Sequence, residues 1–313
     1  MSLRLGELAV IVAALLVVLI ALPVHGQAAE NTIGVIMTGD IPYYQDLHKA
    51  FMARLGQIGL MSKTEVIVQK PYPDDISLSN AARKLIATDV DAIVVYGAPA
   101  ALAVVKERTK IPMVYAAVYE PLTPELKMRS STGIYVRLSI SSLLRYLRSL
   151  NQINTLGVVY SSYEEDSVYQ FSELTKLAAQ YGMKIEGINL KRHQDAVAKL
   201  AGRKMDAVLL TGSSIAHMAM GQIIEYAKEK KIPYASFFLS TDTRAIVSLA
   251  ANPNQQGEKI ADKVQKILDG ISPDKIRSEA ASDVELIFNL KDANALGMKL
   301  SMELVTEATR LIK

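Results

Sequence analysis

The hydrophobic residues of this chain fall into short, nearly continuous runs that alternate with longer stretches of helical spacing. The first run, NTIGVIM, starts at Asn31; apolar residues then recur at Leu47, Phe51 and Leu55, and the next run, VIVQ, starts at Val66. Short apolar runs predict strands, and apolar positions three or four residues apart predict an amphipathic helix. This alternation is typical of parallel strands that helices cover on both faces.

The same pattern occurs twice, because three landmarks recur in the same order and at nearly the same spacing. The chain is therefore predicted to form two similar α/β lobes. Ligands of such open sheets bind beyond the carboxyl ends of the strands, so two facing lobes would hold a ligand in the cleft between them. The paired segments are NTIGVIMTGD (31–40) with NTLGVVYSSY (154–163), DAIVVYGAPA (91–100) with DAVLLTGSSI (206–215), and KIPMVYAAV (110–118) with KIPYASFF (231–238).

The loops after the predicted strands are rich in acids, hydroxyls and tyrosines. A buried carboxylate there could pair with a ligand ammonium, and a tyrosine ring could stack on a planar or apolar ligand. Hydroxyls and backbone N–H groups could hold a carboxylate, and small residues leave a helix start open to an anion. The candidate ligand-binding residues are Asp40, Tyr43, Tyr44, Ala98, Glu120, Ser162, Asp166, Ser167, Thr211, Ser213 and Asp242.

Each candidate also has a purely structural interpretation. Acids and small hydroxyl residues cap helices, and the two tyrosines could form a hydrophobic staple on the helix that follows them. Glu164 and Glu165 belong to a run of three acids and are predicted to be solvated residues at a helix start. Arg137 and Arg244 could bind a ligand carboxylate in bidentate fashion, or could instead bridge the two lobes.

Composition excludes several classes of protein and site. The 313 residues are 50% hydrophobic, which is enough to fill two domain cores. The absence of cysteine excludes disulfides, thiolate metal sites and a cysteine nucleophile. The net charge of +3 arises from interspersed charges of both signs, a pattern that does not indicate a nucleic-acid partner.

The chain also lacks the sequence motifs of common enzymes. Its four histidines are scattered, and no G-x-S-x-G, G-x-x-x-x-G-K-[ST] or H-E-x-x-H motif occurs. Ser213 and His217 lie one helical turn apart without an evident acid partner, and His217 is predicted to lie on a helix surface. We therefore expect a binding protein without catalytic residues, metal site or cofactor.

The N-terminal segment has the three parts of a secretory signal. Arg4 precedes an apolar run from Leu8 to Leu22, and Pro23 and the small-residue stretch VHGQAA follow it. The apolar run is shorter than the roughly 20 residues of a membrane span. Residues 1–28 are therefore predicted to be a cleavable signal peptide, and the mature protein is predicted to be exported.

Three segments resemble a known family over essentially the whole predicted mature chain. They are IPMVYAAVYEPLTP at Ile111, NTLGVVYSSYEEDSVYQFSELTKLAAQYGMKIEG at Asn154, and VELIFNLKDANALGM at Val284. These segments resemble the periplasmic substrate-binding proteins of ABC importers, in the tryptophan/tyrosine-binding-like group. Members that take aromatic amino acids have Asp-Pro, an Asn-rich loop and Thr-Asp-Asn where this chain has Glu120-Pro121, SSYEEDS and TGSS. These departures bear on the ligand and leave the transport interpretation intact.

The resemblance implies a type I periplasmic binding fold, in which two Rossmann-like lobes with parallel sheets close around a small molecule. The chain would cross between lobes near residues 132–138, 245–250 and 284–289. Lobe 1 would comprise residues 29–133 and 246–283, and lobe 2 residues 134–245 and 284–313. We expect a periplasmic monomer that delivers its ligand to an ABC permease in the inner membrane.

The ligand class is less defined than the fold. The loops favour an amino acid, aromatic or branched, although similar folds also accept sugars and nucleosides. An alternative function is a sensor that presents its ligand to a membrane signalling receptor, and the sequence does not separate that role from import.

Overall fold

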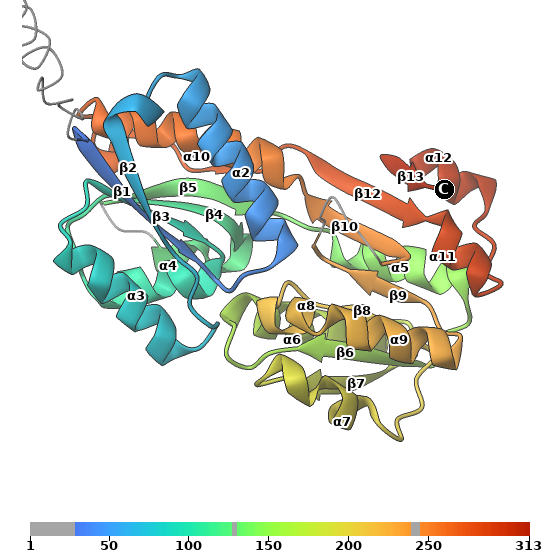
Figure 1. The fold of residues 1–313 in the computed structure, drawn as a ribbon. Helices are drawn as coiled ribbons and strands as arrows, with labels where there is room; N and C mark the ends of the chain where they lie inside the picture. The colour runs from blue at the N-terminus through green and yellow to red at the C-terminus, as the bar shows by residue number, and fades with distance from the viewer. Residues whose placement is uncertain (1–28, 127–129, 239–244) are drawn as a thin grey trace, which may run out of the picture.

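The computed structural model describes residues 29–126, 130–238 and 245–313, which form two lobes joined side by side (Figure 1). Each lobe contains one mostly parallel β-sheet with helices packed against it. The prediction of two α/β lobes is therefore confirmed. The predicted signal peptide, residues 1–28, lies outside the described residues.

The first lobe is built on a six-stranded sheet with the order β11-β5-β4-β3-β1-β2, and its described pairings are parallel. Helices α2 and α10 cover one face, and α3 and α4 cover the other (Figure 1). The elements are β1 (Asn31–Met37), α2 (Pro42–Gln57), β2 (Thr64–Gln69), α3 (Asp75–Ala87), β3 (Ala92–Tyr96), α4 (Ala98–Lys106), β4 (Met113–Tyr119), β5 (Ser131–Val136), α10 (Pro253–Leu268) and β11 (Glu279–Ala280).

The second lobe is built on a seven-stranded sheet with the order β13-β12-β10-β9-β8-β6-β7. Its described pairings are parallel except that β10 runs antiparallel to β12. The elements are α5 (Ile140–Leu150), β6 (Thr155–Tyr160), α6 (Glu165–Gln180), β7 (Lys184–Asn189), α7 (Ala196–Leu200), β8 (Ala207–Leu210), α8 (Ser214–Met218), α9 (Met220–Lys230), β9 (Tyr234–Ser236), β10 (Val247–Ala251), β12 (Val284–Asn289), α11 (Leu290–Ala295), α12 (Met302–Glu307) and β13 (Arg310–Ile312).

Helix α2 illustrates how the hydrophobic pattern produces the packing. Its buried residues include Leu47, Phe51 and Leu55, which recur every four positions and therefore lie on one face. That face packs on α10, where the α-carbon of Gly257 lies against the backbone of Leu47 and Phe51. A β-carbon at position 257 would collide with this backbone, so the close crossing of the two helices requires glycine.

Three segments connect the lobes: the chain passes from β5 to α5, from β10 to α10, and from β11 to β12. Strand β10 lies in the second sheet, whereas the predicted division counted residues 246–283 with the first lobe. Its pairing with β9 and β12 places it there, while Ala250 and Ala251 at its end pack into the core of the first lobe. Strand β10 therefore contributes to both lobes.

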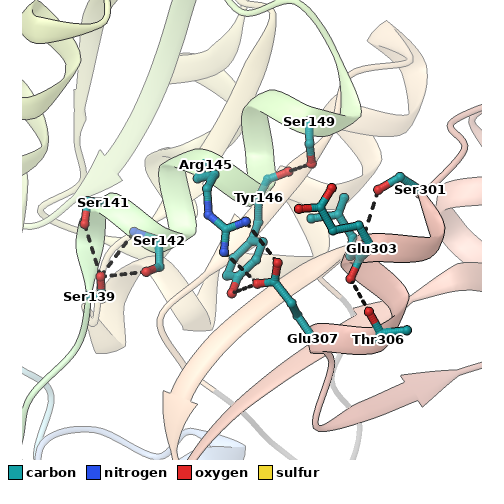
Figure 2. Close-up of polar contacts among 11 residues, drawn as sticks. Ser139, Ser141, Ser142, Arg145, Tyr146, Ser149, Ser301, Glu303, Thr306 and Glu307 are labelled. Atoms are coloured by element: carbon teal, nitrogen blue, oxygen red, sulfur yellow. Dashed lines mark hydrogen bonds and ion pairs between the residues drawn. The ribbon is translucent and has the colours of Figure 1, made fainter.

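The C-terminal segment is attached to the second lobe through α5. Figure 2 shows the Arg145 guanidinium donating from Nη1 to Oε1 of Glu307 at 3.1 Å and from Nη2 to Oε2 at 2.6 Å. The Tyr146 hydroxyl donates to the same Oε2 at 2.8 Å. Ser301 caps α12 by accepting from the Leu304 N–H. These contacts hold α12 and the adjacent β13 at the edge of the sheet.

Within the described ranges, no helix has both the length and the apolar character that a membrane crossing requires.

Candidate functional site

A small cavity lies where the two lobes meet, with a volume of about 20 Å³. This volume holds about one water molecule, so little free space remains at this contact between the lobes. Two predicted ligand-binding residues, Tyr43 and Asp166, line it, one from each lobe. The lining residues are Tyr43, Ala117, Tyr119, Val136, Leu138, Asp166, Gln170, Gly212, Phe237, Phe238 and Ala251.

Tyr43, at the start of α2, is fixed by hydrogen bonds to distant parts of the chain. Its hydroxyl donates to the Ala251 carbonyl at 2.9 Å and accepts from Nε2 of Gln256 at 2.8 Å. Its ring stacks on Phe238 of the second lobe, with centroids 4.5 Å apart and an interplanar angle of 19°. Burial raises the pKa of the Tyr43 hydroxyl, which therefore stays protonated. Tyr43 thus forms a rigid aromatic wall that already contacts the opposite lobe.

Ala117, in β4, adopts a backbone conformation that is uncommon for a residue with a side chain. Its φ angle is +57°, and the pairing of β4 with β5 shifts register between Tyr115 and Val118. The Ala117 N–H leaves the ladder and donates to Oε1 of Gln256 at 2.9 Å. Strained backbone of this kind is concentrated at functional sites. Gln256, in α10, therefore joins β4 to Tyr43 at the start of α2.

Asp166, in the first turn of α6, is the buried acid of the cavity. Its side chain is 3% exposed, and Oδ1 accepts from the Ser167 N–H at 3.0 Å. Burial raises the pKa of Asp166 well above its usual value, and the neighbouring carboxyl groups of Glu164 and Glu165 raise it further. One turn along α6, Oε1 of Gln170 accepts from the Gly212 N–H at 2.6 Å. The second lobe thus brings a desolvated carboxyl group to the cavity wall.

Glu164 was predicted to be solvated, and this prediction is wrong, because it is only 1% exposed. Its carboxylate accepts from the Ser213 hydroxyl, from the Ser214 N–H at 2.7 Å and from the Ile215 N–H at 3.2 Å. These three donors compensate for the cost of burying the charge. Burial nevertheless raises the pKa of Glu164 to about 7.

The predicted hydroxyl candidates form internal contacts in the second lobe, outside the lining of the cavity. The hydroxyls of Ser167 and Thr211 share a hydrogen bond of 2.7 Å, and Thr211 also donates to the Val159 carbonyl. Ser162 is exposed and bonds to Asn189 through both its N–H and its hydroxyl. Ser213 caps α8 and donates to Glu164. The structure therefore gives these four residues supporting positions.

Two of the predicted acids lie in partly exposed ion pairs instead of the cavity. Asp40 accepts from Lys70 at 3.0 Å and from Gln45 at 2.8 Å. Glu120 pairs with Arg137 in bidentate fashion, and this guanidinium lowers the pKa of Glu120. Asp242, the remaining predicted acid, lies outside the described residues.

Tyr44 and Ala98 are buried next to the cleft without lining the cavity. Tyr44 packs edge-on against Phe238 at 5.7 Å between centroids, and its hydroxyl lies close to Gly97. Gly97 has a φ of +92°, and a β-carbon there would collide with the Tyr44 hydroxyl. The glycine before Ala98 thus allows α4 to begin directly beside the tyrosine.

Most of the apolar lining, including Phe237, Phe238 and Leu138, was not among the predicted ligand-binding residues. The two phenylalanines end the KIPYASFF run, which has the signature of a buried strand and gives no separate signal for a cleft.

His217 was predicted to lie on a helix surface, and this prediction is wrong. Its Nδ1 lies 2.7 Å from the Ser213 carbonyl and its Nε2 lies 2.7 Å from the Ser236 hydroxyl. Burial lowers the pKa of His217 to about 4, so the ring is neutral near pH 7.

The described residues contain no group of three or more histidines and acids placed to hold a metal ion. The cavity instead combines four aromatic rings, one carboxyl group and one carboxamide. Apolar walls with a few convergent polar groups are characteristic of small-molecule binding sites.

Comparisons with solved structures give the same architecture. A conserved domain protein from Vibrio cholerae matches with a TM-score of 0.83 and 22% identity, covering 90% of this chain and 99% of that protein. An ABC domain from Streptococcus pneumonia in complex with L-Trp matches with a TM-score of 0.82 and 19% identity, covering 91% and 100%. A solute binding protein from Bacillus halodurans with bound myo-inositol has a TM-score of 0.61 and 13% identity, covering 86% and 98%. The predicted type I periplasmic binding fold is confirmed.

No curated protein sequence matches this chain. A family model does match it over residues 45–312, which include nearly all the described residues and every residue that lines the cavity except Tyr43. The resemblance on which the sequence analysis relied is therefore confirmed. The chain belongs to the family of ABC transporter substrate binding proteins.

Proposed function

We propose that this protein is the solute-binding component of an ABC importer, which captures a small molecule between its lobes and delivers it to a membrane permease. The observation that carries this proposal is the cavity lined by residues of both lobes in a chain of this family. Members of the family typically work in the periplasm or outside the cell. Export by the N-terminal segment, periplasmic location and action as a monomer belong to the same proposal.

Domain closure is the working step of such a receptor. A ligand that contacts both lobes stabilises the closed state, and a permease that recognises that state receives the loaded protein. Tyr43 and Asp166 support this mechanism because they face one cavity from opposite lobes. A ligand between them gains its full set of contacts only when the lobes close.

The ligand proposed from the sequence is an amino acid, aromatic or branched. An ammonium group on such a ligand would find a counter-charge in Asp166, and an apolar body would pack between Tyr43, Tyr119 and Phe238. The cavity must widen to admit any of these compounds, because its present volume is about that of a water molecule. Opening of the lobes supplies this space.

Thermal unfolding of the purified protein, refolded to remove any carried-over ligand, tests the receptor function. The panel comprises amino acids, the corresponding amines, sugars and nucleosides. A ligand that binds only the folded state adds about 2.7 kcal/mol of stability at a hundredfold excess over its dissociation constant. A rise of the midpoint with a single class supports the receptor; an unchanged midpoint across the whole panel contradicts it.

A further inference from the structure

Five donors around the cavity are engaged with acceptors of the protein. On the first-lobe side, the Ala117 N–H donates to Gln256, the Tyr43 hydroxyl to the Ala251 carbonyl, and the Tyr119 hydroxyl to Oε2 of Glu173 at 2.7 Å. On the second-lobe side, the Gly212 N–H donates to Gln170 and the Phe238 N–H to the Ser236 hydroxyl at 3.0 Å. A ligand carboxylate entering the cavity would have to compete with these bonds.

The hydroxyl and N–H groups that were predicted to hold a ligand carboxylate also donate to an acceptor of the protein. The Ser213 hydroxyl and the N–H groups of Ser214 and Ile215 all donate to Glu164. The protein's own carboxylate therefore occupies the position that a ligand carboxylate would need at the start of α8. A second anion there would be repelled by Glu164 and would lack free donors.

The cavity presents the opposite chemistry to a cation. Asp166 lines the cavity and is only 3% exposed. Its Oδ1 accepts a hydrogen bond from the Ser167 N–H. The rings of Tyr43, Tyr119, Phe237 and Phe238 complete the wall. Aromatic rings attract organic cations. A cation beside Asp166 also favours the ionised form of this desolvated carboxyl group, so that binding of the cation and loss of the Asp166 proton are coupled. Aromatic rings from both lobes and one buried acid thus line the space.

We propose that the ligand is an organic ammonium ion without a carboxylate, that is, an amine on an apolar or aromatic body, whose charge Asp166 neutralises. This inference rests on the receptor function proposed above and narrows it. It replaces the amino acid with the corresponding amine, because Asp166 supplies a partner for the ammonium group, whereas five donors that a carboxylate could use already bind acceptors of the protein. Asp166 is then the residue that determines specificity.

Two matched ligand pairs test the proposal by isothermal titration of the wild-type protein. The pairs are phenethylamine with L-phenylalanine, and isopentylamine with L-leucine, which differ only in the carboxylate. We expect the amine of at least one pair to bind about tenfold or more tightly than its amino acid, as a like charge beside a buried acid is costly. Equal binding, or tighter binding of the amino acids, overturns the proposal.

Asp166→Asn provides the second test, with Asp40→Asn as the matched acid-to-amide control on the other lobe. We expect Asp166→Asn to weaken the preferred amine about 30-fold or more, since it removes one partner of a buried charge pair. Asp40→Asn should leave the affinity within about twofold, because Asp40 lies in a partly exposed ion pair with Lys70. Full retention of amine affinity in Asp166→Asn also overturns the proposal, and the wild-type comparison stands even if this variant folds poorly.

The same titrations separate this inference from the receptor function. Binding of a sugar or nucleoside without binding of either amine would contradict the proposed ammonium ligand but support the proposed solute-binding function. If no compound of the panel binds, both proposals are contradicted.

Discussion

The starts of α2 and α6 occupy equivalent places in the two lobes, yet they carry opposite chemistry. Each helix follows the first strand of its repeat, and each brings a residue to the cavity. Helix α2 begins at Pro42 and continues with Tyr43 and Tyr44, without an acid in its first turn. Helix α6 follows Glu164 and has two acids in its first turn. The duplicated scaffold thus places a tyrosine at this position of one lobe and a buried acid at the equivalent position of the other.

The two walls are also held in place differently. Tyr43 depends on Gln256 of α10 and on the end of β10, which lie more than 200 residues away in the sequence. Glu164, which precedes α6, is held by the start of α8, and Asp166 accepts from the Ser167 N–H, so these hydrogen bonds lie within the second lobe. The position of Tyr43 therefore depends on the segment that connects the two lobes, whereas the positions of Glu164 and Asp166 depend on the second lobe alone.

Removing the carboxylate of Glu164 should have the largest effect on stability. Glu164→Ala leaves the Ser213 hydroxyl and two N–H groups without their acceptor in a buried site, which typically costs about 3 kcal/mol or more. Urea unfolding measures this loss, with Ser162→Ala as the exposed control in the same loop. A loss below about 1 kcal/mol would contradict the supporting role assigned to Glu164.

A smaller loss is expected at the aromatic wall. Tyr43→Phe keeps the ring and its stacking on Phe238 but removes the hydroxyl that joins Ala251 and Gln256. The unpaired carbonyl and amide should lower the free energy of unfolding by about 1–2 kcal/mol. Tyr163→Phe, on a tyrosine that is 42% exposed, is the matched control and should stay near wild type. Equal effects of the two variants would argue against the network.

His217 should make the second lobe sensitive to acid. Its pKa is lowered from 6.5 to about 4, so the folded protein binds fewer protons there than the unfolded chain. The stability that it contributes is fully present above pH 6.5 and is lost as the pH falls through 4. Urea midpoints at pH 7.5 and 4.5 should therefore differ more in wild type than in His217→Gln. Identical pH profiles of the two proteins would show that the ring titrates normally.

The smallest effect is expected at Glu120. Its carboxylate is paired with Arg137 but largely solvated, so Glu120→Gln should change stability by less than about 1 kcal/mol. The affinity for a ligand of the cavity should stay within about twofold, because Glu120 does not line it. A loss of affinity comparable to that of Asp166→Asn would show that Glu120 takes part in ligand binding.

Most of the fold could be read from the sequence, because strand-length apolar runs and four-residue spacing report burial directly. Tyr43 and Asp166 could also be found, since they lie just after strands whose carboxyl ends face the cleft. Glu164 could not: three consecutive acids indicate a solvated surface, and the donors that compensate its burial come from residues 213–215. Gln256 was missed for the same reason, because its partners lie in β4 and α2. Nothing in the sequence AAV indicates that Ala117 takes a positive φ.

The contact between Tyr43 and Phe238 has a consequence for the occupancy of the receptor. The two rings belong to opposite lobes and stack on each other, so a contact between protein side chains favours the closed arrangement. A ligand can enter only the fraction of molecules that is open, and its apparent dissociation constant rises as that fraction falls, about tenfold if one molecule in ten is open. The strength of a ring contact between two protein side chains thus contributes to the ligand concentration at which such a substrate-binding protein fills.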